Sequence, residues 1–240
     1  MIITNELNYN DEGTVCRGFI AYNSESSTPM PAVMVVHDWG GRGDDACAKA
    51  RQLAALGYVG FAIDMYGQAQ LGHDELEKRA LMAPLMNNRQ KLLQRIKAAF
   101  DFLAQLPQVD KKNIAAIGYC FGGLCVLDLA RSGTDVKAVA SFHGLLSAPP
   151  GDTGKAIKTS ILVLHGYDDP LAKPEQVNQF ALEMTARKAD WQIHMYGLTA
   201  HSFTNPQAHD LQKGLVYNEQ AERRSWQSTQ AFLEEQFGTY

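Results

Sequence analysis

The pattern of hydrophobic and polar residues changes once along the chain. In the first part, apolar and polar residues alternate over 3–9 and 15–22, and the turn-forming stretch 10–13 separates the two segments. Alternation around a short polar loop predicts two strands paired as an antiparallel hairpin. From residue 32 onward, short apolar runs alternate with segments of helical spacing. This second pattern predicts buried parallel strands connected by helices.

The individual elements follow from these periodicities. Six further strands are expected over 32–36, 58–63, 114–117, 136–142, 161–165 and 191–196. Helices are expected over 44–56, 75–106, 124–131, 174–188 and 217–237. Gly57 should end the first helix, and Pro84 should break or kink the second. Eight strands with helices after most of them predict the α/β class: a mostly parallel, doubly wound sheet with an antiparallel N-terminal hairpin. A length of 240 residues fits one domain over 1–240.

Composition and charge exclude several classes of protein. The chain is 45% hydrophobic and 20% charged, which argues against disorder. A net charge of −4 without a basic run gives no reason to expect a nucleic-acid partner. The N-terminus lacks a secretory pattern, and no apolar stretch reaches the roughly 18 residues of a membrane span. The four cysteines form no C-x-x-C pair, so we expect reduced thiols in a cytoplasmic protein. The oligomeric state is not indicated.

The segment NIAAIGYCFGGLC, residues 113–125, carries the strongest chemical signal. An apolar strand pattern stops at Gly118, Cys120 follows, and a helical pattern begins within a few residues. This is the arrangement of a nucleophile elbow, in which a sharp strand-to-helix turn projects the nucleophile and small residues at Gly118 and Gly122 allow close packing. Sulfur replaces the usual hydroxyl. The segment therefore predicts a thiol nucleophile, whereas Cys16, Cys47 and Cys125 are expected to be buried as small apolar residues.

A thiol nucleophile needs a base and a group that orients the base, and the chain offers both in the order nucleophile, acid, histidine. The acid follows the strand 161–165, where Asp168 and Asp169 are adjacent; we favour Asp169 because it precedes a proline. His201 lies in the loop after the last strand. Both loops follow carboxyl ends of strands, where α/β sheets bind ligands. His143 either lines a pocket or packs in the core.

The other histidines suggest structural or surface roles. His165 and His194 lie in strands and are expected to be structural, and His73 and His209 are expected at the surface.

The segment after the strand 32–36 is where the second donor of an oxyanion hole usually arises. Fixed N–H groups must point at the oxygen that becomes negative during attack. The backbone N–H groups of Phe121 and Trp39 are the two candidates. Alternatively, GGRG over 40–43 is only a flexible loop against which Trp39 packs. A dinucleotide site is excluded because the full G-x-G-x-x-G spacing is missing.

The pieces VVHDWGG, GYCFGG, LHGYDDP and YGLTAHSFTNP occur in this order over nearly the whole chain. With them the sequence resembles the dienelactone hydrolase family of the α/β-hydrolase fold. The resemblance implies a triad of Cys120, Asp169 and His201 and oxyanion-hole amides at Trp39 and Phe121. It also places an acidic residue that takes part in thiol activation at Asp38, one methylene shorter than the family's usual glutamate. The alternative is that Asp38 only binds the 40–43 loop.

One departure from the family concerns substrate charge. The resemblance implies arginines that hold a substrate carboxylate, one of them a few residues after the histidine, but residues 202–206 contain none. Arg79 or Arg89 is a candidate for the other arginine, and Tyr119 for a further substrate contact. Without a guanidinium fork, carboxylate binding is weaker. A related ester, lactone or thioester is therefore at least as good a candidate as dienelactone itself.

These observations predict a hydrolase that cleaves a small-molecule carboxylic ester or lactone through an acyl-thiol intermediate. No metal is expected because no Cys or His pair has ligand spacing, and the reaction needs no organic cofactor. The alternatives within enzymes are a broad esterase or a thioesterase. The alternative outside enzymes is a non-catalytic ligand-binding protein on the same scaffold.

Overall fold

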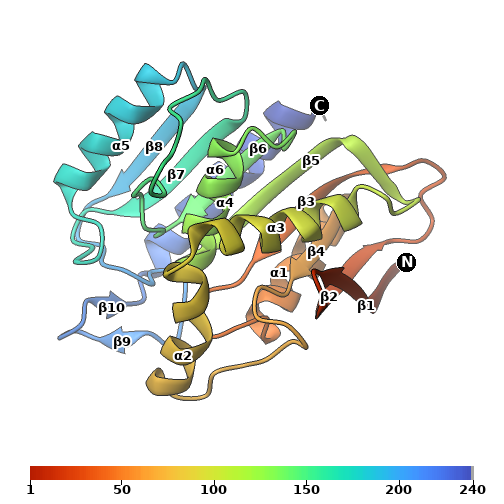
Figure 1. The fold of residues 1–240 in the computed structure, drawn as a ribbon, viewed down its shortest axis with the longest axis horizontal. Helices are drawn as coiled ribbons and strands as arrows, with labels where there is room; N and C mark the ends of the chain where they lie inside the picture. Colours follow the sequence, from red (N-terminus) through yellow and green to blue (C-terminus); the bar gives the residue numbers. More distant parts are fainter. Residues whose placement is uncertain (239–240) are drawn as a thin grey trace. The chain divides into compact units, whose positions relative to one another are not determined.

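A computed structural model describes residues 1–238 of the chain (Figure 1). The chain divides into two compact units, Met1–Ile117 and the part from Gly118 onward. Strand β5 (Val109–Tyr119) runs from the first unit into the second. The active-site candidates on the nucleophile turn and on the loops after the last strands all belong to the second unit.

The first unit begins with the predicted hairpin. Its strands and helices are β1 (Ile2–Asp11), β2 (Thr14–Asn23), β3 (Met30–Val36), α1 (Asp44–Ala55), β4 (Val59–Ile63), α2 (Glu75–Met86) and α3 (Arg89–Leu103). Strand β2 pairs antiparallel with β1 and β4, and β3 pairs parallel with β4. The strand order is β1-β2-β4-β3-β5. In Figure 1, α3 lies in front of these strands and α1 behind them.

The second unit continues the sheet from the end of β5. Its elements are α4 (Phe121–Arg131), β6 (Ala138–Phe142), β7 (Ser160–Gly166), α5 (Pro174–Ala186), β8 (Trp191–Tyr196), β9 (His209–Asp210), β10 (Leu215–Val216) and α6 (Glu219–Phe237). The order is β5-β6-β7-β8, and β6, β7 and β8 are parallel. Strands β9 and β10 form a separate two-stranded hairpin. The predicted α/β class, with eight strands, mostly parallel pairing and an antiparallel start, is confirmed.

Burial explains why the apolar runs form strands. Every residue of β4, β6 and β7 is buried, as expected for parallel strands covered on both faces. Gly57 has φ +93° and its N–H donates to Ala54 O (3.1 Å), so it ends α1 as predicted. Three helices start at side chains that accept a backbone N–H: Asp74, Asn88 and Asn218.

Several boundaries differ from the prediction. The helical region 75–106 divides, but Pro84 lies inside α2 and the interruption comes at residues 87–88. The physical reason is the Asn88 side chain, which accepts from Lys91 N (3.0 Å) and starts a new helix. Strand β5 is longer than 114–117, and α4 starts at Phe121 rather than residue 124. The short β9–β10 hairpin was not predicted because two-residue strands have no periodicity.

Two buried arginines hold the long loop over 145–158 in the second unit. Arg187, 3% exposed, binds the Asp152 carboxylate and donates to Lys155 O (2.7 Å). Arg131 donates to Leu146 O (2.8 Å) and pairs with Glu183 (2.8 Å). A loop without secondary structure therefore has an ordered path.

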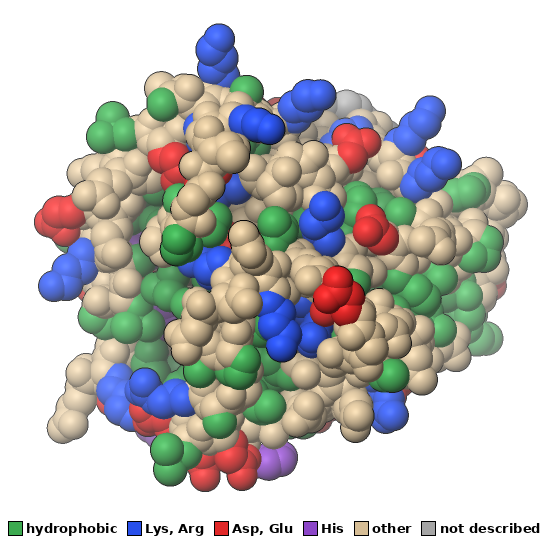
Figure 2. Space-filling model, viewed as in Figure 1, with side chains coloured by type: hydrophobic (Ala, Val, Ile, Leu, Met, Phe, Trp, Pro, Cys, Tyr) green, Lys and Arg blue, Asp and Glu red, His purple; other side chains and the backbone are tan. Residues whose placement is uncertain are grey.

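The surface shows no region dominated by one sign of charge on the face drawn in Figure 2, where basic and acidic side chains are interspersed. This distribution agrees with the small net charge of −4. Among residues 1–238, no helix combines the length and apolar character needed to cross a lipid bilayer.

Candidate active site

The nucleophile turn has the geometry of an elbow. Strand β5 ends at Tyr119 and α4 begins at Phe121, so Cys120 alone makes the turn, with φ +53° and ψ −111°. A positive φ is unfavourable for a residue with a Cβ atom. The bend holds because the Cys120 N–H donates to Phe142 O on β6 (3.0 Å). A Cβ atom at Gly118 would lie 2.1 Å from the Gly122 carbonyl oxygen, which explains why position 118 is glycine.

Cys120 is the one cysteine of the four that is not buried. It is a partly exposed free thiol, whereas the other three are buried free thiols, as predicted. Its sulfur sits immediately before the N-terminus of α4, where the helix dipole stabilises negative charge. The Phe121 N–H lies at the same helix end. Both features suit a thiolate and the oxyanion that its attack creates.

The loop after β7 brings Asp169 against His201. Asp169 is buried, its Oδ1 accepts from Leu171 N (2.8 Å), and its Oδ2 accepts from Nδ1 of His201 (2.8 Å). Asp168 is exposed, and its backbone N–H donates to Thr199 O (2.9 Å). Of the two adjacent aspartates, Asp169 is therefore the one in contact with the imidazole.

The backbone holds His201 from the side of the β9–β10 hairpin. Its N–H donates to Gly214 O (2.9 Å), and its carbonyl accepts from Val216 N (2.9 Å). Gly166, at the end of β7, lies so close to Thr199 that a Cβ atom would be 2.4 Å from its carbonyl oxygen. These contacts fix the histidine loop to the β7 loop. They act before any substrate binds.

The surroundings of His201 favour its protonated form. Burial alone would lower the pKa of His201, but the negative charge of the Cys120 thiolate and the hydrogen bond to Asp169 together raise the pKa to about 10. Since Nδ1 bonds Asp169, Nε2 is the atom that faces the sulfur. Nε2 is buried and makes no hydrogen bond of good geometry to another atom of residues 1–238. Nε2 is therefore positioned to exchange a proton with the sulfur.

Among the further histidines of the second unit, His143 contacts His201, and His165 and His194 make hydrogen bonds elsewhere. His143, left open between a pocket and the core by the sequence, is 3% exposed and packs edge-on against His201 with ring centroids 5.0 Å apart. Burial lowers the pKa of His143 well below its ordinary value, and His201 lowers it further. His165 donates from Nε2 to Ala172 O (2.7 Å) and supports the loop that carries Asp169. His194 bonds Ser228 (3.0 Å).

Tyr119 is the last residue of β5, immediately before Cys120. Its ring stacks on Phe142 with centroids 4.5 Å apart, and its hydroxyl is buried without a hydrogen-bond partner among residues 1–238. Its predicted contact with substrate stays a prediction.

The first unit contains the candidates Asp38 and Trp39. Asp38 Oδ1 accepts from Gly40 N (2.7 Å), which is the loop contact considered as the alternative for this carboxylate. The Trp39 carbonyl accepts from the Tyr66 hydroxyl (2.9 Å), and Lys78 Nζ lies 5.5 Å from the centre of the Trp39 ring. The backbone around Trp39 is thus held on both sides. Its role as a second oxyanion donor stays a prediction.

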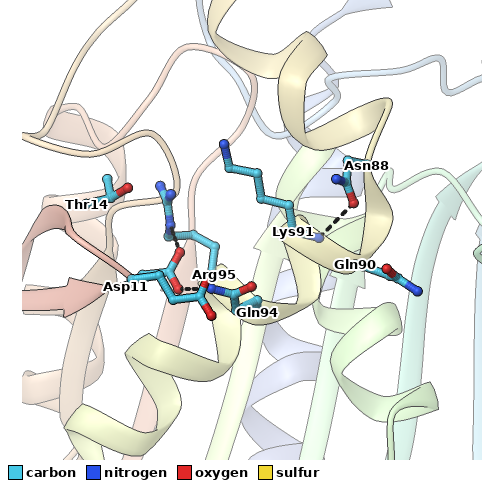
Figure 3. A pocket seen from close by; sticks show the side chains of 8 residues that line it. Asp11, Thr14, Asn88, Gln90, Lys91, Gln94 and Arg95 are labelled. Carbon is cyan, nitrogen blue, oxygen red and sulfur yellow. Dashed lines mark hydrogen bonds and ion pairs between the residues drawn. The ribbon is translucent and has the colours of Figure 1, made fainter.

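The candidate arginines lie on α2 and α3. Arg79 is exposed and pairs with Glu75 one turn away (2.6 Å). Neither Arg79 nor Arg89 lines the polar cavity of about 380 Å³ in this unit. Figure 3 shows that Arg95 reaches Asp11 there instead, with a 2.5 Å bond between two buried groups. The carboxylate already neutralises this guanidinium.

Metal ligation has no support within residues 1–238, where no three His, Cys, Asp or Glu side chains are grouped as a metal site requires. The second unit brings together a partly exposed thiol, an imidazole and a buried carboxylate bound to the imidazole, which are the kinds of group that nucleophilic catalysis uses. The contact between His143 and His201 was not predicted from the sequence. The two residues are 58 positions apart, and no local pattern connects them.

Comparison with known proteins gives a consistent result. The model of the dienelactone hydrolase family matches residues 17–237. The crystal structure of a dienelactone hydrolase-like promiscuous phosphotriesterase from metagenomic libraries is 37% identical, with a TM-score of 0.93 over 98% of each chain. The uncharacterized protein K02A2.1 of Caenorhabditis elegans is 41% identical over 61% of this chain and 95% of its own. A protein named putative carboxymethylenebutenolidase from Saccharolobus solfataricus is 23% identical over 95% of this chain and 97% of its own.

Proposed function

The chain belongs to the dienelactone hydrolase family and is a hydrolase, and from this premise we propose that it cleaves uncharged carboxylic esters or lactones through an acyl-thiol intermediate on Cys120. One observation carries the proposal. The strained elbow presents the Cys120 sulfur to an imidazole whose other nitrogen is bound to a buried carboxylate, 2.8 Å away. The raised pKa of His201 supports a protonated imidazole that can donate its proton to the leaving group.

The reaction begins with attack of the Cys120 thiolate on the carbonyl carbon. The carbonyl π electrons move to oxygen, and the N–H of Phe121 stabilises the resulting negative charge at the N-terminus of α4. The C–O bond of the leaving alcohol then breaks, and His201 donates its Nε2 proton to the alkoxide. The product is a thioester on Cys120. In a lactone, the alcohol stays attached to the same acyl group.

Deacylation uses the same groups, with His201 acting first as a base instead of an acid. Neutral His201 takes a proton from water through Nε2, and the hydroxide attacks the thioester carbonyl. Collapse of the second tetrahedral intermediate expels the Cys120 thiolate and leaves His201 protonated. Asp169 keeps the proton of His201 on Nδ1 and stabilises the imidazolium throughout. The resting ion pair is then restored without a metal or organic cofactor.

The side chains around residues 202–206 favour a substrate without negative charge. Residues 202–206 contain no cationic side chain, and two arginines of the same unit, Arg131 and Arg187, are held in buried ion pairs with Glu183 and Asp152. A free carboxylate on the substrate would lack a bidentate partner from these groups. We therefore expect neutral esters and lactones to react faster than dienelactone, which is an anion.

A second candidate reaction is hydrolysis of neutral phosphotriesters. The observation that favours it is the 37% identity over 98% of each chain with the metagenomic phosphotriesterase. A phosphotriester has no charge and offers an electrophilic phosphorus bound to a leaving alkoxide, so the same thiolate attack could begin the reaction. An aryl dialkyl phosphate therefore belongs beside aryl esters and small lactones in the substrate panel.

The decisive experiment traps the intermediate. The protein is mixed with an aryl ester, quenched in acid within one turnover, and digested for mass spectrometry. We expect acylation of Cys120, a burst of phenol equal to the enzyme concentration, and loss of both in Cys120→Ala. Cys125→Ala is the matched control because Cys125 is a buried thiol on the adjacent helix. Equal turnover in the Cys120→Ala and parent proteins would refute the proposal.

Two further outcomes decide between the remaining alternatives. Binding of esters without release of alcohol would identify a non-catalytic ligand-binding protein. Replacing Asp38 by asparagine tests the predicted role in thiol activation: unchanged alkylation of Cys120 and unchanged turnover would leave Asp38 only its bond to Gly40.

A further inference from the structure

The residue after β6, His143, connects the three chain segments that carry the proposed triad. The Cys120 N–H bonds the carbonyl of Phe142, the residue immediately before His143 (3.0 Å). The N–H of His143 itself donates to Leu164 O on β7 (2.9 Å), the strand whose following loop carries Asp169. The backbone of His143 has φ +40°, an unfavourable value for a residue with a Cβ atom. The contacts on both sides hold it in this conformation.

The side chain of His143 reaches the third segment, the loop that begins at His201. Its Nε2 and the Thr204 hydroxyl are 2.8 Å apart. Its ring packs edge-on against Phe203 (5.1 Å between centroids) and against His201 (5.0 Å, 66° between planes). His143 is thus fixed by Thr204 and lies on the imidazole of His201. His143, His201 and Phe203 are buried, and the bond to Thr204 is partly buried.

The ring of His143 restricts a rotation of the His201 imidazole that Asp169 alone does not prevent. The bond from Nδ1 to Asp169 fixes one edge of the imidazole, but a single hydrogen bond allows the ring to rotate about the bond axis. Such rotation would move Nε2 away from the Cys120 sulfur. The packed ring of His143 blocks this rotation on one side. Tight packing at this distance leaves no space for water between the two rings.

We propose that His143, anchored by Thr204, is a positioning residue that holds the His201 imidazole in the orientation that directs Nε2 at Cys120. The inference rests on the proposed function, in which His201 exchanges a proton with that sulfur. His143 touches neither the substrate nor the sulfur in this account. It acts through His201 alone.

The test uses two variants, one that removes the hydrogen bond between Thr204 and His143 and one that removes the ring of His143. Thr204→Val replaces the hydroxyl by a methyl group, and His143→Gln removes the ring. We expect kcat for an aryl ester to fall about 10- to 100-fold, the range caused by small misplacements of reacting groups, while KM changes less than about threefold. Alkylation of Cys120 by iodoacetamide at pH 7 should slow in parallel, because the thiolate loses its imidazolium partner. Thr204→Ser retains the hydroxyl and should restore most of both rates.

Matched controls separate positioning from stability. His194→Gln removes another histidine of the same unit, whose ring bonds Ser228 on α6, and should leave both rates unchanged. Thermal unfolding of each variant shows whether the protein is folded at the assay temperature. The groups that act on the charge of His201 are Asp169, Cys120, His143 and His165, and only His143 changes in these variants.

The outcomes distinguish this inference from the proposed function. Folded Thr204→Val with parental kcat and alkylation rate would overturn the positioning role, while the parent's acylation of Cys120 would still stand. A parent protein that never acylates Cys120 would refute the proposed function itself. A parallel loss of kcat and alkylation in Thr204→Val, restored by Thr204→Ser, would support the inference even if His143→Gln does not fold.

Discussion

Replacing Asp169 by asparagine perturbs one charge without changing the volume of the side chain. In the protein, Asp169 Oδ1 accepts from Leu171 N (2.8 Å) and Oδ2 accepts from His201 Nδ1 (2.8 Å). An asparagine would keep its carbonyl oxygen on Leu171 N and present its NH₂ group to His201. Nδ1 would then have to accept this hydrogen bond, and the proton would move to Nε2. A neutral imidazole protonated on Nε2 cannot take a proton from Cys120 or from water.

The magnitude follows from the burial of the pair, whose side chains are 1% and 0% exposed. Two unit charges about 4 Å apart at an effective dielectric constant of about 20 interact by about 4 kcal/mol. Since about 1.4 kcal/mol corresponds to a factor of ten in rate, loss of the carboxylate should lower kcat/KM by about 10³. Proteases with the wrong histidine tautomer lose about 10⁴ in kcat, which is of the same order.

The assay is steady-state hydrolysis of an aryl ester, together with the rate of Cys120 alkylation at pH 7. Asp168→Asn is the matched control: the adjacent carboxylate is exposed and should be replaceable with less than a twofold change. The reverse result, in which Asp168→Asn abolishes activity and Asp169→Asn does not, would refute the reasoning. Equal activity of the two variants would mean that neither carboxylate orients His201.

Three more predictions concern pH and stability. Because the pKa of His201 is raised from about 6.5 in the unfolded chain to about 10, its stabilising contribution is complete below about 6.5 and is lost as pH rises through about 10. The thermal stability of the parent should therefore fall more steeply between these values than that of Cys120→Ala, which lacks the group that raises this pKa, and equal slopes would contradict the raised pKa of His201. Gly118→Ala should destabilise the fold by at least about 1–3 kcal/mol in urea, since its Cβ would meet backbone, whereas Gly197→Ala, with open space around its Cβ, should not. Arg187→Met leaves the partly exposed Asp152 carboxylate and the carbonyl oxygens of Lys155 and Arg131 without this donor and should cost about 1–3 kcal/mol without changing KM; a melting temperature equal to the parent's would show that these contacts contribute nothing.

Local chemistry made much of this protein predictable. Short apolar runs such as those of β3 and β4 predict strands that are covered on both faces, and these strands are almost fully buried. The sharp turn at Cys120 was predictable because Gly118 and Cys120 stand at a spacing typical of a strand-to-helix bend. Interruption of the helical region 75–106 was also expected. Its position was not, because the cap at Asn88 outweighs Pro84.

Contacts between distant segments were decided by the tertiary structure alone. The sequence favoured Asp169 over Asp168, but the contact of Asp169 with His201 depends on how the loop after β7 packs on Thr199, 31 residues away from Asp168. The pair His143–Thr204 spans 61 residues in the same way. The sequence determined which residue types could do the chemistry and in what order they occur, since spacing and propensity are local properties. Their orientation depends on through-space packing, which no spacing along a chain encodes.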